Sequence, residues 1–221
     1  MYIDDLLIIS LQLAIWSAVL GAGTQYLLSK TDYRRIRHVY EKKMEAEPTA
    51  SLSTLILHYI IIWLVVYLFL SYSTFHLYSD LYDVVRIPAT VLIIDFANYA
   101  FHRSMHHKML YSRFHSLHHS NHNPQSWTDS TLTDLGDWIV SSLIFICPLM
   151  LLGATPGVLL SLTWVTVQVQ LNHSGYLLPK LPFVISSLEH TYHHWYYDCN
   201  YSELTTIPDM IFGTYRAELA I

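Results

Sequence analysis

Two long, uncharged stretches of apolar residues constrain the fold of this chain most strongly. The first runs from Leu6 to Leu28, and the second runs from Leu52 to Leu70, broken only by His58. A helix of about 20 predominantly apolar residues crosses a bilayer, so both stretches predict transmembrane helices. The composition agrees, because 52% of the 221 residues are hydrophobic and only 13% are charged. We therefore expect an integral membrane protein.

Three shorter apolar runs follow. They are Ile87–Phe101, Trp138–Leu152 and Pro156–Leu171, and each is shorter than the roughly 20 residues that cross a bilayer untilted. The last two predict a membrane hairpin over residues 138–171 that turns around Gly153 and either spans the bilayer or re-enters it. Nothing in the sequence suggests strands or an internal repeat. We expect a single all-α membrane domain over residues 1–221, built as a bundle of four to five apolar helices.

The positive charges indicate how this bundle is oriented. Six basic residues share the loop between the first two spans: Lys30, Arg34, Arg35, Arg37, Lys42 and Lys43. Cytosolic loops are enriched in lysine and arginine, so residues 30–50, 102–136 and 172–221 are expected in the cytosol. Residues 1–101 would then supply membrane spans and a basic connector. Residues 102–221 would supply a cytosolic helical cap around the hairpin.

Histidines cluster in the part of the chain that is expected to form the cap. Seven of the 14 histidines lie between positions 102 and 122, and three more lie between 190 and 194. Three motifs contain most of them: HRSMH with His102 and His106, HSLHH with His115, His118 and His119, and HTYHH with His190, His193 and His194. Histidines four apart on a helix lie about 40° apart on one face, so the first pair can bind one ion, and each triplet can reach one or two.

These eight imidazoles predict a metal site. Neutral imidazoles without a clustered carboxylate suit zinc, iron, copper or nickel, whereas magnesium and calcium need oxygen ligands. Eight ligands exceed what one ion binds, so we expect a dinuclear centre with open positions for a small molecule. A pH-sensing patch and adventitious metal binding by exposed histidines are the alternatives.

Taken in order, the three motifs, NHSGY and CNYSELTTIPDMIFGT resemble the fatty acid hydroxylase and sterol desaturase superfamily over residues 95–218. The resemblance implies an integral membrane, non-haem di-iron enzyme that uses dioxygen and external electrons to hydroxylate or desaturate a lipid. By matching position it implies eight metal ligands: His102, His106, His115, His118, His119, His190, His193 and His194. His173 in NHSGY matches a further family histidine and would otherwise cap the last span. His107 and His122 stay open as ligands.

The implied cofactors are two iron ions, which zinc can replace on purification. Electrons would come from NAD(P)H through a separate donor such as cytochrome b5 or a ferredoxin with its reductase, and the lipid would enter from the bilayer. No nucleic-acid partner is expected. The implied location is the endoplasmic reticulum of a eukaryote or the inner membrane of a bacterium. A zinc-dependent membrane hydrolase and a metal transporter remain alternative functions.

Two residues are expected to support the histidines. Asp95, Tyr99, His102 and His106 are spaced by four, three and four, which places them along one stripe of the third apolar helix. A carboxylate inside a membrane segment is costly and usually has a partner. We therefore assign Asp95 and Tyr99 to the catalytic site, where Asp95 would orient a histidine directly or through Tyr99. The alternative is a salt bridge, for example to Arg103, or a polar lock between helices.

Overall fold

The computed structural model describes residues 3–36, 50–72, 81–153 and 155–217. Within these ranges every regular element is a helix, and the β contacts are two isolated bridges. The prediction of an all-α fold is confirmed for the part of the chain that the structure describes.

Five long helices form the bundle: α1 (Ile3–Leu28), α3 (Leu52–Tyr72), α4 (Asp83–Met105), α6 (Leu135–Leu152) and α7 (Pro156–Asn172). The apolar runs predicted four of these helices to within a few residues. Helix α4 is longer than its apolar run, because it tolerates Pro88 near its start and continues through polar residues to Met105. Helices α4 and α6 are long and apolar enough to cross a membrane, judged by length and composition.

The helices pack around a shared apolar core, and apolar side chains also lie on the outside of the bundle. Helix α4 packs against α6 and α7, α1 packs against α3 and α7, and α3 packs against α6. The core contains Ile94 from α4 and Leu162 from α7. By contrast Leu64, Leu92 and Leu143 are exposed on three different helices. Exposed apolar surface that continues over several helices is typical of contact with lipid.

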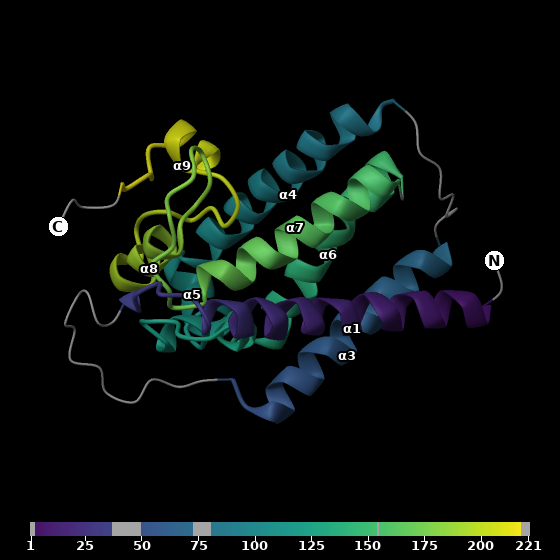
Figure 1. Ribbon diagram of the computed structural model, residues 1–221, viewed down its shortest axis with the longest axis horizontal. Coiled ribbons are helices and arrows are strands. Elements are labelled where there is room, and N and C mark those ends of the chain that lie inside the picture. The colour runs from purple at the N-terminus through teal and green to yellow at the C-terminus, as the bar shows by residue number, and fades with distance from the viewer. Residues whose placement is uncertain (1–2, 37–49, 73–80, 154, 218–221) are drawn as a thin grey trace.

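The turn of the predicted hairpin lies at the same end of the bundle as the start of α4 (Figure 1). There the hydroxyl of Thr155 donates to Asp83 Oδ1 at 2.5 Å, and the N–H of Gly157 donates to Asp83 Oδ2 at 3.3 Å. A side chain at Gly157 would not fit, because its Cβ would lie 2.8 Å from Asp83 Cγ. The hairpin therefore extends as far along the bundle as α4 does.

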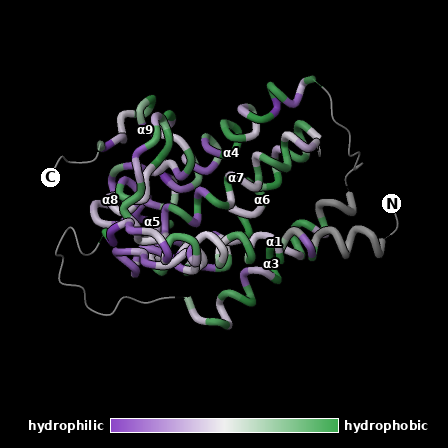
Figure 2. Tube along the Cα trace, in the orientation of Figure 1, coloured by the Kyte–Doolittle hydropathy of each residue, from purple (hydrophilic) through white to green (hydrophobic). Residues whose placement is uncertain are grey.

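Short helices gather at the opposite end, which we call the polar end: α5 (Lys108–Phe114), η1 (His118–Ser120), η2 (Trp127–Thr131), α8 (Ser187–Tyr196) and α9 (Ile207–Ile211). Figure 2 shows hydrophilic residues concentrated there, while the long helices are mostly hydrophobic. Arg35, which follows α1, donates to the carbonyls of Gln125 and Ser174 at 2.8 Å each. These hydrogen bonds attach the end of α1 to the polar end.

Candidate metal centre

Nine histidines meet at the polar end in two adjacent groups. The five-histidine group contains His102, His106, His115, His119 and His193. The four-histidine group contains His118, His173, His190 and His194. Within each group the candidate ligand nitrogens all lie within 4.8 Å of one another. The two groups adjoin, since the rings of His119 and His194 are 4.7 Å apart. These nine residues are the nine candidates that the sequence predicted.

Helix α8 supplies both groups because of its helical geometry. Successive residues turn by about 100°, so His190 and His194 lie about 40° apart and share the four-histidine group. His193 points about 100° away from His194 and joins the five-histidine group. A capping box fixes the start of the helix, since Ser186 Oγ accepts from Glu189 N at 3.1 Å and Glu189 Oε2 accepts from Ser186 N at 2.9 Å.

The HSLHH triplet reaches both groups without an α-helix. Helix α5 ends at Phe114, His115 follows as its C-cap, and η1 begins at His118. The sequence analysis treated this triplet as one helical face, and this local interpretation differs from the structure. His115 and His119 enter the five-histidine group, whereas His118 enters the four-histidine group.

Most of the imidazoles are held by an acceptor on their outer nitrogen. Nδ1 lies near an oxygen in six cases: His102 with Tyr201 O at 2.7 Å, His115 with Asp137 Oδ2 at 3.3 Å, His118 with Leu132 O at 3.3 Å, His173 with Val169 O at 2.8 Å, His193 with Cys199 O at 2.8 Å and His194 with Asn121 O at 2.9 Å. A carbonyl only accepts, so Nδ1 carries the proton and Nε2 keeps its lone pair. Such outer partners orient metal-binding histidines.

The inner nitrogens have more lone pairs than protons, and a cation would bind the lone pairs that are left. His190 Nε2 lies 3.1 Å from His173 Nε2 and 3.2 Å from His194 Nε2. One proton on His190 Nε2 can be donated to only one of these two nitrogens, which leaves the lone pair of the other without a donor. Two nitrogens about 2.1 Å from one ion and about 90–109° apart would be separated by about 3.0–3.4 Å. The donors of this group therefore fit a shared metal ion.

The same test applies to the five-histidine group. His119 Nε2 lies 3.1 Å from both His106 Nε2 and His193 Nε2. In addition, Nε2 of His102 and Nε2 of His115 are buried without a hydrogen-bond partner among the described residues. Buried polar atoms without partners are rare, and a metal ion would supply the partner here. Both groups therefore fit a bound metal.

The surroundings hold seven of these histidines neutral. Burial lowers the pKa of His118, His119, His190, His193 and His194 well below the ordinary value, and neighbouring imidazoles lower it further. Burial also lowers the pKa of His173 to about 4 and that of His106 to about 2. Neutral imidazoles have the lone pairs that bind metal.

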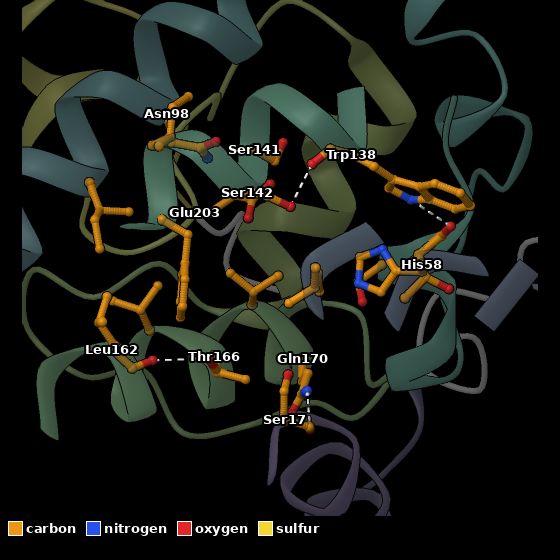
Figure 3. Close-up of a pocket in the computed structure, with 18 of the residues that line it drawn as sticks. Ser17, His58, Asn98, Trp138, Ser141, Ser142, Leu162, Thr166, Gln170 and Glu203 are labelled. Carbon is orange, nitrogen blue, oxygen red and sulfur yellow. Dashed lines mark hydrogen bonds between the residues drawn. The ribbon is translucent and has the colours of Figure 1, made fainter. Parts of the chain in front are cut away.

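A cavity of about 410 Å³ lies among the long helices (Figure 3). It reaches the histidines. Its wall includes His102 and His115 from the five-histidine group and His118 and His173 from the four-histidine group. Much of the remaining wall is apolar, as at Leu162, and the volume lies in the usual range of ligand pockets, about 300–1,000 Å³.

Asp95 and Tyr99 lie beside the centre without touching an imidazole among the described contacts. The Asp95 carboxylate accepts from Leu204 N at 3.3 Å and from Thr205 N and Oγ1 at 3.0 and 2.5 Å. The Tyr99 hydroxyl accepts from Arg103 at 2.8 Å. Asp95 thus joins α4 to the segment after α8 by hydrogen bonds.

The structure also places the two histidines that the sequence left open as metal ligands. His107 caps α5 and is exposed, as is His122, and neither belongs to the two groups. Sequence reasoning missed Asp137, whose Oδ2 is 3.3 Å from His115 Nδ1 and accepts from the Thr133 hydroxyl at 2.6 Å. The sequence contained one signal for Asp137: this carboxylate comes directly before the apolar run that starts at Trp138.

Comparison with known proteins now bears on this arrangement. The sequence model described as fatty acid hydroxylase matches residues 87–214, which are more than half of the chain and include all nine histidines. The chain belongs to the fatty acid hydroxylase family. The superfamily that the histidine motifs predicted is thereby confirmed.

Several relatives of the chain have names that describe enzymes acting on sterols. A Delta(7)-sterol 5(6)-desaturase of Aspergillus fumigatus is 25% identical over 135 residues, 61% of this chain and 38% of the relative. Methylsterol monooxygenase 1 of Rattus norvegicus is 30% identical over 141 residues, 60% of this chain and 47% of the relative. The chain thus spans less than half the length of these two relatives. No solved structure matches it significantly.

Proposed function

We propose that the chain is a membrane-bound, non-haem di-iron oxygenase that hydroxylates or desaturates a lipid with dioxygen and external electrons. The family and the names of its relatives support this reaction class. One geometric observation supports it most directly: the cavity among the long helices touches two histidines from each group. A lipid chain in that cavity would place one of its carbons beside both ions.

Two bound iron ions would supply the activation of dioxygen that an unactivated carbon–hydrogen bond requires. The residues of this chain would bind the ions and the lipid, orient the ligand rings and shield the reacting carbon from water. Nine imidazoles are proposed as ligands, with Asp137 and five backbone carbonyls fixing six of their rings. The apolar cavity wall would hold the lipid and exclude water from the reacting carbon.

Asp95 and Tyr99 are proposed as positioning residues that act through the segment after α8. The carbonyl of Tyr201 accepts from His102 Nδ1, and Asp95 anchors the backbone a few residues further on. The ring of Tyr99 packs edge-on against that of Tyr201, with 6.1 Å between centroids. Displacement of this segment would turn the His102 ring.

The reaction needs dioxygen and two electrons. Hydroxylation converts R–H, O₂, two electrons and two protons into R–OH and water, and desaturation removes two hydrogens and forms two waters. The electrons are proposed to come from NAD(P)H through a separate protein such as cytochrome b5 or a ferredoxin. The polar end, where the histidines lie, is the side on which such a donor would approach.

We further propose that the long helices cross the membrane with the polar end in the cytosol, in the endoplasmic reticulum of a eukaryote or the inner membrane of a bacterium. Arg35, Arg103 and Arg113 lie at the polar end, and Asp83 lies at the other. In intact bacterial cells an impermeant probe should label Leu81→Cys, which is exposed, and should label Ser116→Cys only after permeabilisation. Sealed endoplasmic reticulum vesicles have their cytosolic face outside, so the two results should be reversed there. Labelling of Ser116→Cys in intact cells, or its protection in sealed vesicles, would overturn this orientation.

Isotope labelling tests the reaction itself. Membranes containing the protein are supplied with reductant and either heavy-isotope dioxygen or heavy-isotope water, and the lipids are analysed by mass spectrometry. Label from dioxygen in a new hydroxyl identifies a hydroxylase, and an unlabelled double bond that forms only with dioxygen identifies a desaturase. Product without dioxygen, or label from water alone, would refute the proposal and favour a zinc hydrolase.

A further inference from the structure

A carboxylic acid lies in the wall of the otherwise largely apolar cavity. Glu203 belongs to the segment between α8 and α9 and lines the cavity, together with Asn98 of α4 (Figure 3). Its side chain accepts a hydrogen bond from Asn98. Among the ion pairs of the described residues none involves Glu203. Glu203 is half-buried, and a carboxyl group that faces a largely apolar cavity without a cationic partner is costly, so its presence needs an explanation.

The fold does not supply that reason. The two N–H groups before Glu203 donate to Asp209, and the two N–H groups after it donate to Asp95. The carbonyl of Glu203 accepts from Asn172 Nδ2 at 2.7 Å. Other side chains therefore fix the backbone on both sides, and the Glu203 side chain is free to serve the cavity that it faces.

Its surroundings favour the neutral acid. Burial raises the pKa of Glu203 to about 7, and the nearby carboxylates of Asp137 and Asp95 also raise it. A protonated carboxyl both donates and accepts hydrogen bonds, as does the amide of Asn98. Together the two groups present a donor and an acceptor to whatever enters the cavity.

We propose that Glu203 and Asn98 form a polar subsite that binds the hydroxyl group of a neutral lipid inside the cavity. A hydroxyl is the complementary group, because it also donates one hydrogen bond and accepts others. This proposal rests on the proposed function, because it names the class of lipid that the enzyme would take. That class is an alcohol, either a sterol or a long-chain alcohol. A free fatty acid should bind poorly at this position, because its carboxylate would lie near the carboxylates of Asp137 and Asp95.

Equilibrium binding to the full chain in lipid nanodiscs tests the subsite without turnover. The probes are cholesterol and hexadecanol, each paired with its methyl ether, and palmitate as the anion. The wild type should bind at least one alcohol about tenfold more tightly than its ether, which is the value of about one buried hydrogen bond, and should bind palmitate least. Comparison of the two alcohols separates sterol from chain recognition.

Three variants locate the preference. Glu203→Leu should abolish it, whereas Glu203→Gln, which keeps a donor and an acceptor, should retain most of it. Thr166→Val is the matched control, because Thr166 lines the same cavity but its hydroxyl already donates to the carbonyl of Leu162 at 2.9 Å. Thermal unfolding adds an independent readout: Glu203→Leu should melt higher than the wild type, since it removes a buried acid that the backbone does not need.

Loss of the alcohol preference in Glu203→Leu alone, with metal content unchanged, supports the subsite. Equal binding of alcohols and ethers by the wild type, or an unchanged preference in Glu203→Leu, would refute it. A lower melting temperature for Glu203→Leu would show that the residue serves the fold instead. These results are independent of dioxygen, so a failed subsite and a failed oxygenase assignment are told apart by the isotope experiment.

Discussion

The two histidine groups differ in ligand number and in what holds them. A six-coordinate ion would keep one free position among five imidazoles and two among four. In the four-histidine group, the outer nitrogens of His118, His173 and His194 all face backbone carbonyls. In the five-histidine group, His115 instead depends on a side chain, Asp137. The four-histidine group therefore has more room for a reactant, and the five-histidine group is more sensitive to substitution of its outer partners.

Removal of one ligand from each group gives the largest expected effect. His118→Ala leaves three imidazoles in the smaller group, and His193→Ala leaves four in the larger one. Both variants should lose turnover below detection, because the dinuclear centre needs both ions. His118→Ala should lose about one ion per chain, whereas His193→Ala should retain more metal, since four ligands still hold an ion.

Metal analysis of the purified variants, together with the lipid assay, checks this difference. His122→Ala is the control, because this exposed histidine lies outside both groups. Both ligand variants should still insert into the membrane, since the long helices do not include either residue. Unchanged metal content in both variants would contradict the assignment of these histidines as ligands.

Substitution of Asp137 tests whether the two histidine groups depend differently on their outer partners. Asp137→Asn keeps the size of the side chain but weakens the acceptor for His115, so activity should fall about 10- to 100-fold, as for other outer partners of metal-binding histidines. The weakened affinity should concern one ion of the two, because the four-histidine group relies on carbonyls that no substitution removes. Titration with a chelator should show one early-released ion; simultaneous release of both would show that the groups do not differ.

Asp95→Asn should have a smaller effect than Asp137→Asn, about tenfold or less on activity. Its carboxylate anchors Leu204 and Thr205, and it reaches His102 only through the intervening segment and Tyr201. Assembly, followed by size-exclusion chromatography, should change less than turnover does. Full activity in this variant would show that Asp95 has a structural role and does not position the histidines.

Much of this fold could be predicted from the sequence, because lipid imposes a simple rule on composition. The apolar runs indicated five helices, and the nine histidines that gather at the polar end were identified by their spacing and by resemblance. Their division between two groups could not be predicted. His118 and His119 are adjacent in the chain but enter different groups, as His193 and His194 do, and which members of distant motifs share a group depends on how the whole chain folds.

Long-range contacts explain the remaining differences. Asp95 lies on the same helical stripe as His102, and the stripe suggested direct support. Its hydrogen bonds instead go to residues more than 100 positions away, which no local pattern reveals. Glu203 shows the same limit, since only the folded chain places it beside Asn98 in the cavity.

The last effect expected is the pH dependence of stability that one member of the four-histidine group, His173, confers on metal-free protein. Burial lowers the pKa of His173 from 6.5 to about 4. Below pH 6.5 the unfolded chain takes up a proton that the folded protein refuses until about pH 4. Stability is therefore fully present above pH 6.5 and is lost as the pH falls, by about 1.4 kcal/mol per pH unit for each such histidine.

Unfolding of metal-stripped protein by urea in mild detergent, between pH 7.5 and 5, measures this slope. His173→Asn removes one titrating group and should flatten the slope by about 1.4 kcal/mol per pH unit, while the exposed His122→Asn should leave it unchanged. Metal loading should make the acid loss steeper, since protons then compete with the ion for the same nitrogens. An equal slope in wild type and His173→Asn would mean that acid opens this group before the protein unfolds, and the four-histidine group would then be no better protected than the five-histidine group.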